Sequence, residues 1–407
     1  MLCETPSLTR RMLLGGAASF TAWAHVPRLA QAAGGKDRRL LVVILRGALD
    51  GLSAVAPLGD PDYEGLRAAI ALRKDGPDAA IGLDGFFALH PALPNFARLY
   101  KAGQGLVVHG AATPYRGRSH FDGQDVLENG LGGVGRTDSG WLNRALSVLP
   151  AGDRIERRNG LGIGTATPLI LRGTSPVLGW APPSMPRATD DLTERVLDLY
   201  QHADPALFRA LSAGLETDRM ARAAMADEKA AGGPATPRGM VQIANGAGRL
   251  MAASDGPRIA ALAFEGWDTH ANEGGAKGRL ATLLGGLDEA FAALEAALAP
   301  VWQDTAVLVV TEFGRTARIN GTEGTDHGTA TVAFLVGGGV RGGRVLADWP
   351  GLKAARLHEG RDLAPTIDLR GVMKGVLADH LGLEGRALDT IVFPDSAPIR
   401  AMRGLVG

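Results

Sequence analysis

Five short apolar runs constrain the fold of this chain more than any other feature. The first, residues 40–45, reads Leu-Leu-Val-Val-Ile-Leu and is followed by Arg-Gly-Ala-Leu-Asp-Gly. A β-branched run of this length, bounded by turn residues, is typical of a strand buried on both faces of a parallel sheet. Similar runs recur at residues 105–109, 259–264, 306–311 and 332–336. We therefore expect these five runs to form one largely parallel sheet.

Helical periodicity separates several of these runs. Residues 92–101 and 280–298 carry leucine and aromatic residues at three-to-four spacing, which indicates helices with one apolar face. Strands that alternate with helices predict a three-layer α/β/α fold with a mostly parallel sheet. Residues of about 185–255 differ, because they are rich in Ala, Arg, Asp and Glu and are interrupted by Gly-Gly-Pro. We expect a helical insertion over the sheet there.

The N-terminus carries the parts of a twin-arginine export signal in order. Arg10 and Arg11 stand directly before an apolar stretch, residues 12–23, which is rich in Gly and Ala. This stretch is shorter than the roughly 20 apolar residues that span a bilayer. Residues 30–32, Ala-Gln-Ala, offer small side chains where a signal peptidase cuts. The alternative is a basic, slightly apolar helix that stays on a cytosolic protein.

The export signal predicts where the mature protein works. We expect residues 1–32 to be removed after passage through the twin-arginine translocase, which leaves residues 33–407 in the periplasm or secreted. The single cysteine, Cys3, lies in the removed segment, so the mature protein has no thiolate ligand and no cysteine nucleophile. The 43 basic and 43 acidic residues balance, so the composition shows no excess of basic residues of the kind that binds nucleic acid. No later segment is long enough to cross a membrane, so we expect no stable membrane insertion.

Polar side chains follow several of the predicted strands, and parallel sheets bind ligands at the carboxyl ends of their strands. These residues are Asp50 after the first run, Arg118, Ser119 and His120 after the second, Asp268 and His270 after the third, and Glu312, Asp326 and His327 after the fourth. Carboxylates and imidazoles gathered at one edge suit a divalent cation. The sequence therefore predicts a metal site for zinc, manganese, magnesium or calcium.

Each of these residues also fits a purely structural role. Asp50 before a glycine suits a turn or a helix N-cap, and Asp268 suits an N-cap. Asp326 with its neighbouring histidine suits a polar turn, and Glu312 suits an ion pair with Arg315. From the residues alone, both interpretations stay open.

The order of the motifs resembles a known family. Residues 90–103, a strand and then residues 113–119 resemble the arylsulfatase helix, strand and nucleophile loop. More closely, the mature chain resembles the bacterial family called domain of unknown function 1501, which is grouped with the alkaline phosphatase–sulfatase superfamily. The motifs are RGxxDGL (46–52), RSHFDxQ (118–124), GWLNR (140–144), WDTHxN (267–272), EFGRT (312–316) and DHG (326–328). The resemblance covers nearly all of the mature chain and implies an alkaline-phosphatase-like fold exported by the twin-arginine route.

The resemblance also implies roles for individual residues. Ser119 lies near the position of the nucleophile, and Arg118 or Arg116 is available to bind an anionic ester group. The implied metal ligands are Asp50, Asp268, His270, Asp326 and His327. This chain departs from the superfamily at Glu312 and Phe313, where an Asp followed by His or Asn is usual, and phenylalanine cannot bind a metal. The missing cysteine also excludes the formylglycine chemistry of sulfatases.

Two functions from different classes follow. The first is an exported, metal-dependent hydrolase of phosphate or sulfate esters, with Ser119 as nucleophile and a small anionic ester as substrate. The second is a non-catalytic periplasmic binding or assembly protein that keeps the fold, which Phe313 favours. A third arrangement is a single-metal or metal-free site in which His120 or His327 acts as general base.

Overall fold

The computed structural model describes residues 37–135, 137–149, 160–164, 167–181 and 233–407, together with short pieces between residues 196 and 215. Residues 38–150 and 158–407 form one compact unit, to which every element named below belongs. The predicted export signal, residues 1–32, lies outside the described residues, as does most of the predicted insertion at about 185–255.

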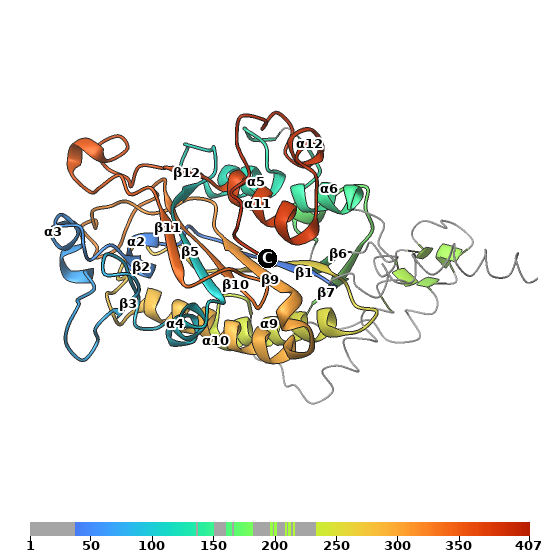
Figure 1. The fold of residues 1–407 in the computed structure, drawn as a ribbon, viewed down its shortest axis with the longest axis horizontal. Coiled ribbons are helices and arrows are strands. Elements are labelled where there is room, and N and C mark those ends of the chain that lie inside the picture. Colours follow the sequence, from blue (N-terminus) through green and yellow to red (C-terminus); the bar gives the residue numbers. More distant parts are fainter. Residues whose placement is uncertain are drawn as a thin grey trace, which may run out of the picture. The chain divides into compact units, whose positions relative to one another are not determined.

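A nine-stranded sheet lies at the centre of the described chain (Figure 1). Its strands run in the order β11 (Arg344–Ala347), β5 (Gly105–Ala112), β10 (Thr331–Val336), β9 (Thr305–Val310), β1 (Arg39–Leu45), β8 (Ile259–Phe264), β6 (Gly160–Ile163) and β7 (Val177–Trp180), and β12 (Ile367–Asp368) pairs with β5. Each of the five apolar runs forms one of these strands, which confirms that prediction. β1 is buried along its whole length, as expected for a strand covered on both faces.

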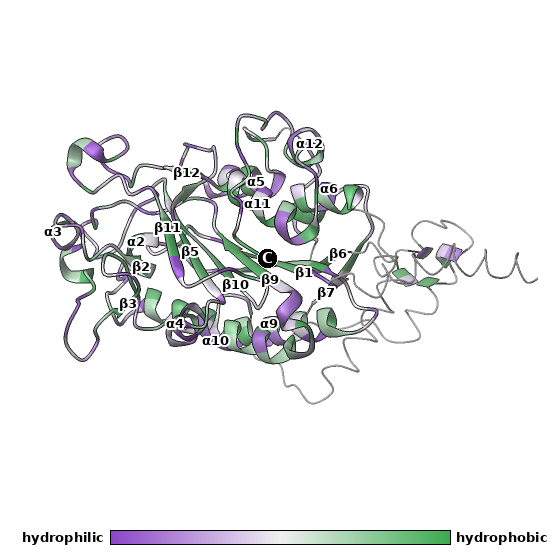
Figure 2. Cartoon of the chain, in the orientation of Figure 1, coloured by the Kyte–Doolittle hydropathy of each residue, from purple (hydrophilic) through white to green (hydrophobic). Residues whose placement is uncertain are grey.

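Helices cover both faces of the sheet. On one face lie α4 (Pro94–Lys101), α9 (Pro237–Ala252) and α10 (Arg279–Ala297), and on the other α5 (His120–Asn129), α6 (Trp141–Val148) and α11 (Leu369–Leu381) (Figure 1). Successive side chains of β1 enter opposite cores, Val43 toward α10 and Val42 toward α11. Figure 2 shows the hydrophobic strands between these amphipathic helices. This is the predicted three-layer α/β/α fold.

One strand departs from the expected parallel arrangement. β10 pairs antiparallel with both β5 and β9, whereas β1 pairs parallel with β8 and β9. A parallel return needs a crossover of a dozen or more residues, usually a helix. Residues 311–330 contain no helix, so the chain turns back and β10 starts at the edge where β9 ends.

The described end of the predicted insertion is α9. This helix packs against α10 and contributes Met240 and Ala244 to the core beneath the sheet. Its side chains therefore belong to the central α/β core. Among the described helices, none combines the length and the apolar character needed to cross a membrane.

Shorter elements complete the unit. A small second sheet contains β2 (Val55–Ala56), β4 (Ala88–Leu89) and β3 (Ile81–Gly82). The short helices are α2 (Gly51–Ala54), α3 (Tyr63–Arg67) and α12 (Gly385–Ala387). The 3₁₀ segments are η1 (Ala68–Ile70), η2 (Leu169–Leu171), η3 (Ala299–Asp304) and η4 (Ala354–Arg356), and η5 (Leu388–Val392) is a short π-helix.

Candidate metal site

Four loops meet at one edge of the sheet. β1, β8 and β9 are parallel, and β5 shares their direction because β5 and β9 both run antiparallel to β10. The loops after these four strands therefore leave from the same edge, where open α/β sheets bind ligands. The loop between β9 and β10 also returns to this edge. Because β10 is antiparallel, the residues just before it, Asp326 and His327, also lie at this edge.

Three side chains from three of these loops form a group that we name the His–Asp cluster: His120, Asp268 and His327. One possible ligand atom from each lies within 4.8 Å of the others. His120 Nε2 lies 3.4 Å from Asp268 Oδ2, and His327 Nε2 lies 3.5 Å from Asp268 Oδ1. His120 is the first residue of α5, so the start of a helix fixes its backbone.

The far sides of both imidazoles are held by acceptors. His120 Nδ1 lies 2.8 Å from Glu312 Oε1, and His327 Nδ1 lies 2.7 Å from the carbonyl oxygen of Arg118. Each Nδ1 must carry a proton to donate to its acceptor, so each Nε2 of a neutral ring is an unprotonated ligand atom. Metal-binding histidines in proteins are typically oriented in this way.

The cluster fits a small divalent cation. His120 Nε2 is buried and has no hydrogen-bond partner, which is costly unless another group satisfies it. In a tetrahedral zinc site with bonds of about 2.0–2.1 Å, neighbouring ligand atoms lie about 3.3 Å apart. The spacings of 3.4 and 3.5 Å to Asp268 are close to this value. Two imidazoles with one carboxylate favour zinc and related transition metals over calcium and magnesium.

His270 extends the cluster toward solvent. Its Nε2 lies 3.2 Å from Asp268 Oδ1 and 2.9 Å from His327 Nε2. Its Nδ1 lies 3.2 Å from Asp326 Oδ1, and the His270 and Asp326 side chains are 45% and 54% exposed. This arrangement would let His270 act as a further ligand, with Asp326 as its orienting carboxylate.

Arg315 fixes the cluster carboxylate. Its buried guanidinium donates to Asp268 Oδ1 at 2.7 Å and to the carbonyl oxygen of Thr325 at 2.6 Å. Burial raises the pKa of Asp268, but the hydrogen bond and the charge of Arg315 outweigh burial and lower that pKa overall. Asp268 is therefore anionic and held in a fixed orientation.

Glu312 lies behind His120 rather than beside the open ligand atoms. Its carboxylate accepts from His120 Nδ1, from the backbone N–H of Gly47 at 2.9 Å, from Gln124 Nε2 at 3.1 Å and from Thr311 Oγ1 at 2.9 Å. Burial raises the pKa of Glu312, yet these hydrogen bonds, with that from His120 foremost, lower it overall. The structure thus makes Glu312 an orienting anion.

Phe313 supports the other face of the His120 ring. The two rings stack with centroids 5.1 Å apart and an interplanar angle of 24°. A Cβ on Gly123 would lie 2.9 Å from the Phe313 ring, so only glycine lets α5 approach this closely. The residue that cannot bind a metal thus helps to hold one that can.

The structure does not bring Asp50 into the cluster. Its Oδ1 caps α2 by accepting from the backbone N–H groups of Leu52 and Ser53, and its Oδ2 forms a buried ion pair with Arg67. Arg67 Nη2 also lies 3.5 Å from Glu273 Oε1. Burial, with the nearby Asp50 charge, raises the pKa of Glu273 to about 8. Of the two interpretations of Asp50, the helix N-cap is the one observed.

Ser119 and Arg118 lie next to the cluster but have other partners. Ser119 Oγ accepts from Asp122 N at 3.4 Å and caps α5. The Arg118 guanidinium pairs with Glu359 at 2.6 Å and with Asp362 at 3.1 Å. Arg118 reaches the cluster through its backbone carbonyl, not through its charge.

Several residues of this region were not predicted from the sequence. Arg67 and Glu273 follow no strand directly, so no position along the chain marked them as partners of Asp50. Gln124 could have been predicted, because it is the last residue of the RSHFDxQ motif. The GWLNR motif has a different role, since Arg144 donates to the carbonyl oxygens of Asn129 and Val392 and thereby links α6 to the end of α5 and to η5.

The fold and the site define an α/β protein with a histidine–carboxylate cluster at the carboxyl edge of its sheet. The chain belongs to the family described as "Protein of unknown function (DUF1501)", which matches residues 90–392. The sequence-based assignment to this family is therefore confirmed. A search of curated proteins found no match.

Solved structures overlap the chain loosely. The phosphonate monoester hydrolase of Agrobacterium radiobacter is 13% identical with a TM-score of 0.38, over 85% of this chain and 74% of that one. Ps i-CgsB in complex with k-i-k-neocarrahexaose is 13% identical with a TM-score of 0.36, over 88% of this chain and 76% of that one. Overlaps this loose leave function to be argued from the chain's own residues.

Proposed function

We propose that this protein is a metal-dependent hydrolase of phosphate or sulfate esters, with His120, Asp268 and His327 as metal ligands. The observation that carries the proposal is the convergence of two imidazole Nε2 atoms and one carboxylate, each held from behind by another residue. Such pre-oriented donors are what a resident cation requires. A divalent ion held there would supply Lewis acidity toward an ester oxygen.

The chain's own residues would prepare the reaction. Glu312 and Phe313 keep the His120 ring in place, and Arg315 keeps Asp268 anionic. Ser119 is our candidate nucleophile because it stands at the N-terminus of the ten-residue helix α5, where backbone N–H groups and the helix dipole favour negative charge. Rotation of the Ser119 hydroxyl away from its long 3.4 Å cap contact would free it for attack.

The first experiment is elemental analysis of the folded protein, purified without chelators or a histidine tag. We expect about one equivalent of a divalent transition metal, lost in Asp268→Ala and His327→Ala. The matched control is His358→Ala, because His358 lies outside the cluster and contacts Asp362 through its backbone. A folded, metal-free wild-type protein would refute the proposal.

The second experiment addresses the nucleophile. Aryl phosphate and aryl sulfate esters would be screened with the metal-loaded protein, and Ser119→Ala is expected to reduce kcat about a thousandfold or more. Retention of both kcat and metal in Ser119→Ala would assign the nucleophilic role to water instead. No turnover of any ester by a metal-loaded protein would favour the second candidate function.

That second candidate is a non-catalytic binding or assembly protein. One observation favours it: the Arg118 guanidinium, which would have to bind an anionic ester group, is paired with Glu359 and Asp362. For either function we propose export through the twin-arginine translocase to the periplasm, on the strength of the N-terminal sequence.

A further inference from the structure

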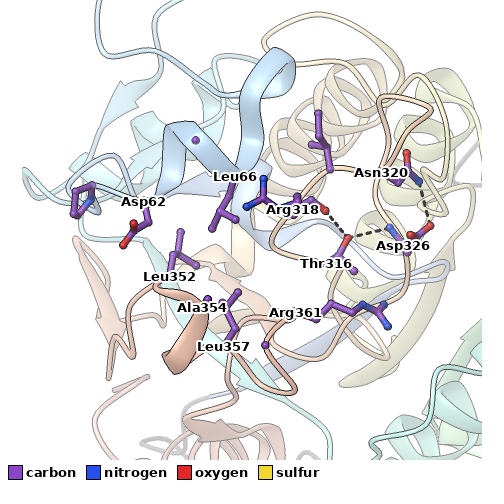
Figure 3. Close-up of a pocket in the computed structure, with 14 residues that line it drawn as sticks. Asp62, Leu66, Thr316, Arg318, Asn320, Asp326, Leu352, Ala354, Leu357 and Arg361 are labelled. Atoms are coloured by element: carbon purple, nitrogen blue, oxygen red, sulfur yellow. Dashed lines mark hydrogen bonds between the residues drawn. The ribbon is translucent and has the colours of Figure 1, made fainter.

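A pocket of about 590 Å³ lies beside the His–Asp cluster. Thr316, Asn320 and Asp326 of the loop between β9 and β10 line one part of it, and Leu66 and Leu352 line another (Figure 3). Its volume falls within the range of roughly 300–1,000 Å³ typical of small-molecule sites. The pocket is therefore large enough for an organic group, not only for an inorganic anion.

Two residues that line the pocket connect it to the cluster. Asp326 lines the pocket, and its Oδ1 lies 3.2 Å from Nδ1 of His270, which in turn contacts Asp268. Arg361 also lines the pocket and donates through its guanidinium to the carbonyl oxygen of His327. A molecule in the pocket would thus end next to the cluster.

The lining has an apolar part and a free cation. Leu66 and Leu352 are buried side chains of the small core at this end of the molecule. Arg318 is exposed, and among the described residues no hydrogen bond or ion pair occupies its guanidinium, whereas Arg361 pairs with Asp362 at 3.3 Å. Figure 3 shows Arg318 reaching toward Leu66, while the Asp62 carboxylate turns away from that side. The cation therefore faces the apolar wall.

We propose that this pocket binds the organic group of the ester, and that this group is apolar with its own anionic substituent, which pairs with Arg318. The inference rests on the proposed function, because it assigns the pocket to the ester that the cluster would cleave. A guanidinium is a planar fork that binds carboxylate, phosphate or sulfate through two hydrogen bonds. A plain phenyl or short alkyl group would fill little of the 590 Å³ and would leave Arg318 unpaired.

The test compares two non-hydrolysable probes by isothermal titration calorimetry. Phenylphosphonate carries the reacting-group mimic alone, and 4-carboxyphenylphosphonate adds the second anion. With the wild-type protein we expect the second probe to bind at least tenfold more tightly than the first. Arg318→Ala should abolish this difference, and Arg356→Ala, which removes an exposed arginine of η4 outside the lining, should keep it.

A second variant tests the pocket by volume. Leu357→Trp places a larger side chain at the partly exposed wall, and we expect it to weaken 4-carboxyphenylphosphonate at least tenfold without changing metal content. Three results would each overturn the inference. The two probes could bind the wild type with equal affinity, Arg318→Ala and Arg356→Ala could lose equal affinity for 4-carboxyphenylphosphonate, or neither probe could bind. Metal content and ester turnover of the same preparations judge the proposed function separately. Arg318-dependent binding to a metal-free protein would refute that function and retain the pocket as an anion-binding site.

Discussion

Replacing Glu312 by Gln tests whether a buried carboxylate behind His120 tunes the proposed metal site. The amide oxygen can take the place of Oε1, which accepts from His120, Gly47 and Gln124. The amide NH₂ then takes the place of Oε2, which accepts from Thr311 Oγ1 in the wild type. In the variant the Thr311 proton can go to the carbonyl oxygen of Leu45 at 2.6 Å, and the amide NH₂ can donate to Thr311 Oγ1. The substitution therefore removes the negative charge and keeps the hydrogen bonds.

Because Glu312→Gln removes the charge and keeps the hydrogen bonds, it should affect metal affinity much more than folding stability. Loss of an orienting carboxylate behind a metal-binding histidine typically lowers metal affinity about 10- to 100-fold, which is about 1.4–2.7 kcal/mol. With the hydrogen bonds retained, the free energy of unfolding of the metal-free protein should change by less than about 1 kcal/mol. Glu312→Ala, in contrast, leaves the donors of His120, Gly47 and Gln124 without this acceptor and should cost several times more stability.

The assay is a competition titration of zinc against a chromogenic chelator, paired with urea unfolding of the metal-free protein. Gln124→Ala is the matched control, because it removes a neighbour of the carboxylate and leaves the contact from Glu312 to His120. Wild-type zinc affinity in Glu312→Gln would refute the reasoning that Glu312 orients a metal ligand. Lower affinity together with lost stability would mean that the variant damages the fold instead.

Three further predictions concern the rest of the chain. Arg67→Ala should lower the free energy of unfolding by about 3–5 kcal/mol in urea titrations, because Asp50 loses its buried cation, while metal content stays at the wild-type level. Burial lowers the pKa of His109 to about 4 from its usual 6.5, so the unfolded chain takes up a proton first as the pH falls, and stability decreases between pH 6.5 and 4. The loss should reach about 3 kcal/mol, and His109→Gln should remove this contribution in unfolding curves across that pH range. Replacing Arg10 and Arg11 by lysine should leave the precursor in the cytoplasm in a fractionation assay, and unchanged export would contradict a twin-arginine signal.

The core of the fold could be predicted from local pattern. Residues 40–45 and 259–264 became strands within a residue of the prediction because a strand buried on both faces needs an unbroken apolar run. Residues 280–298 became a helix because their apolar side chains repeat at helical spacing. Each of these patterns depends only on residues that are close together in the sequence.

Which polar residues meet was decided by tertiary structure. Asp50 and Asp268 both follow buried strands, yet one caps a short helix beside Arg67 and the other joins the cluster. The residues near Asp50 in the sequence do not predict that Arg67 is buried against it, because that pairing depends on how α3 packs. In the same way, only the tertiary structure shows that His120 directs Nε2 toward Asp268.

The sequence by itself determined the alternation of strands and helices, the family and the edge of the sheet at which polar side chains gather. Only the tertiary structure decided that residues 311–330 return antiparallel and bring His327 to within 3.5 Å of Asp268. The physical reason is the range of the forces involved. The periodic pattern of apolar residues depends on residues that are close together in the sequence. The direction of a loop side chain depends on contacts between segments that are far apart in the sequence.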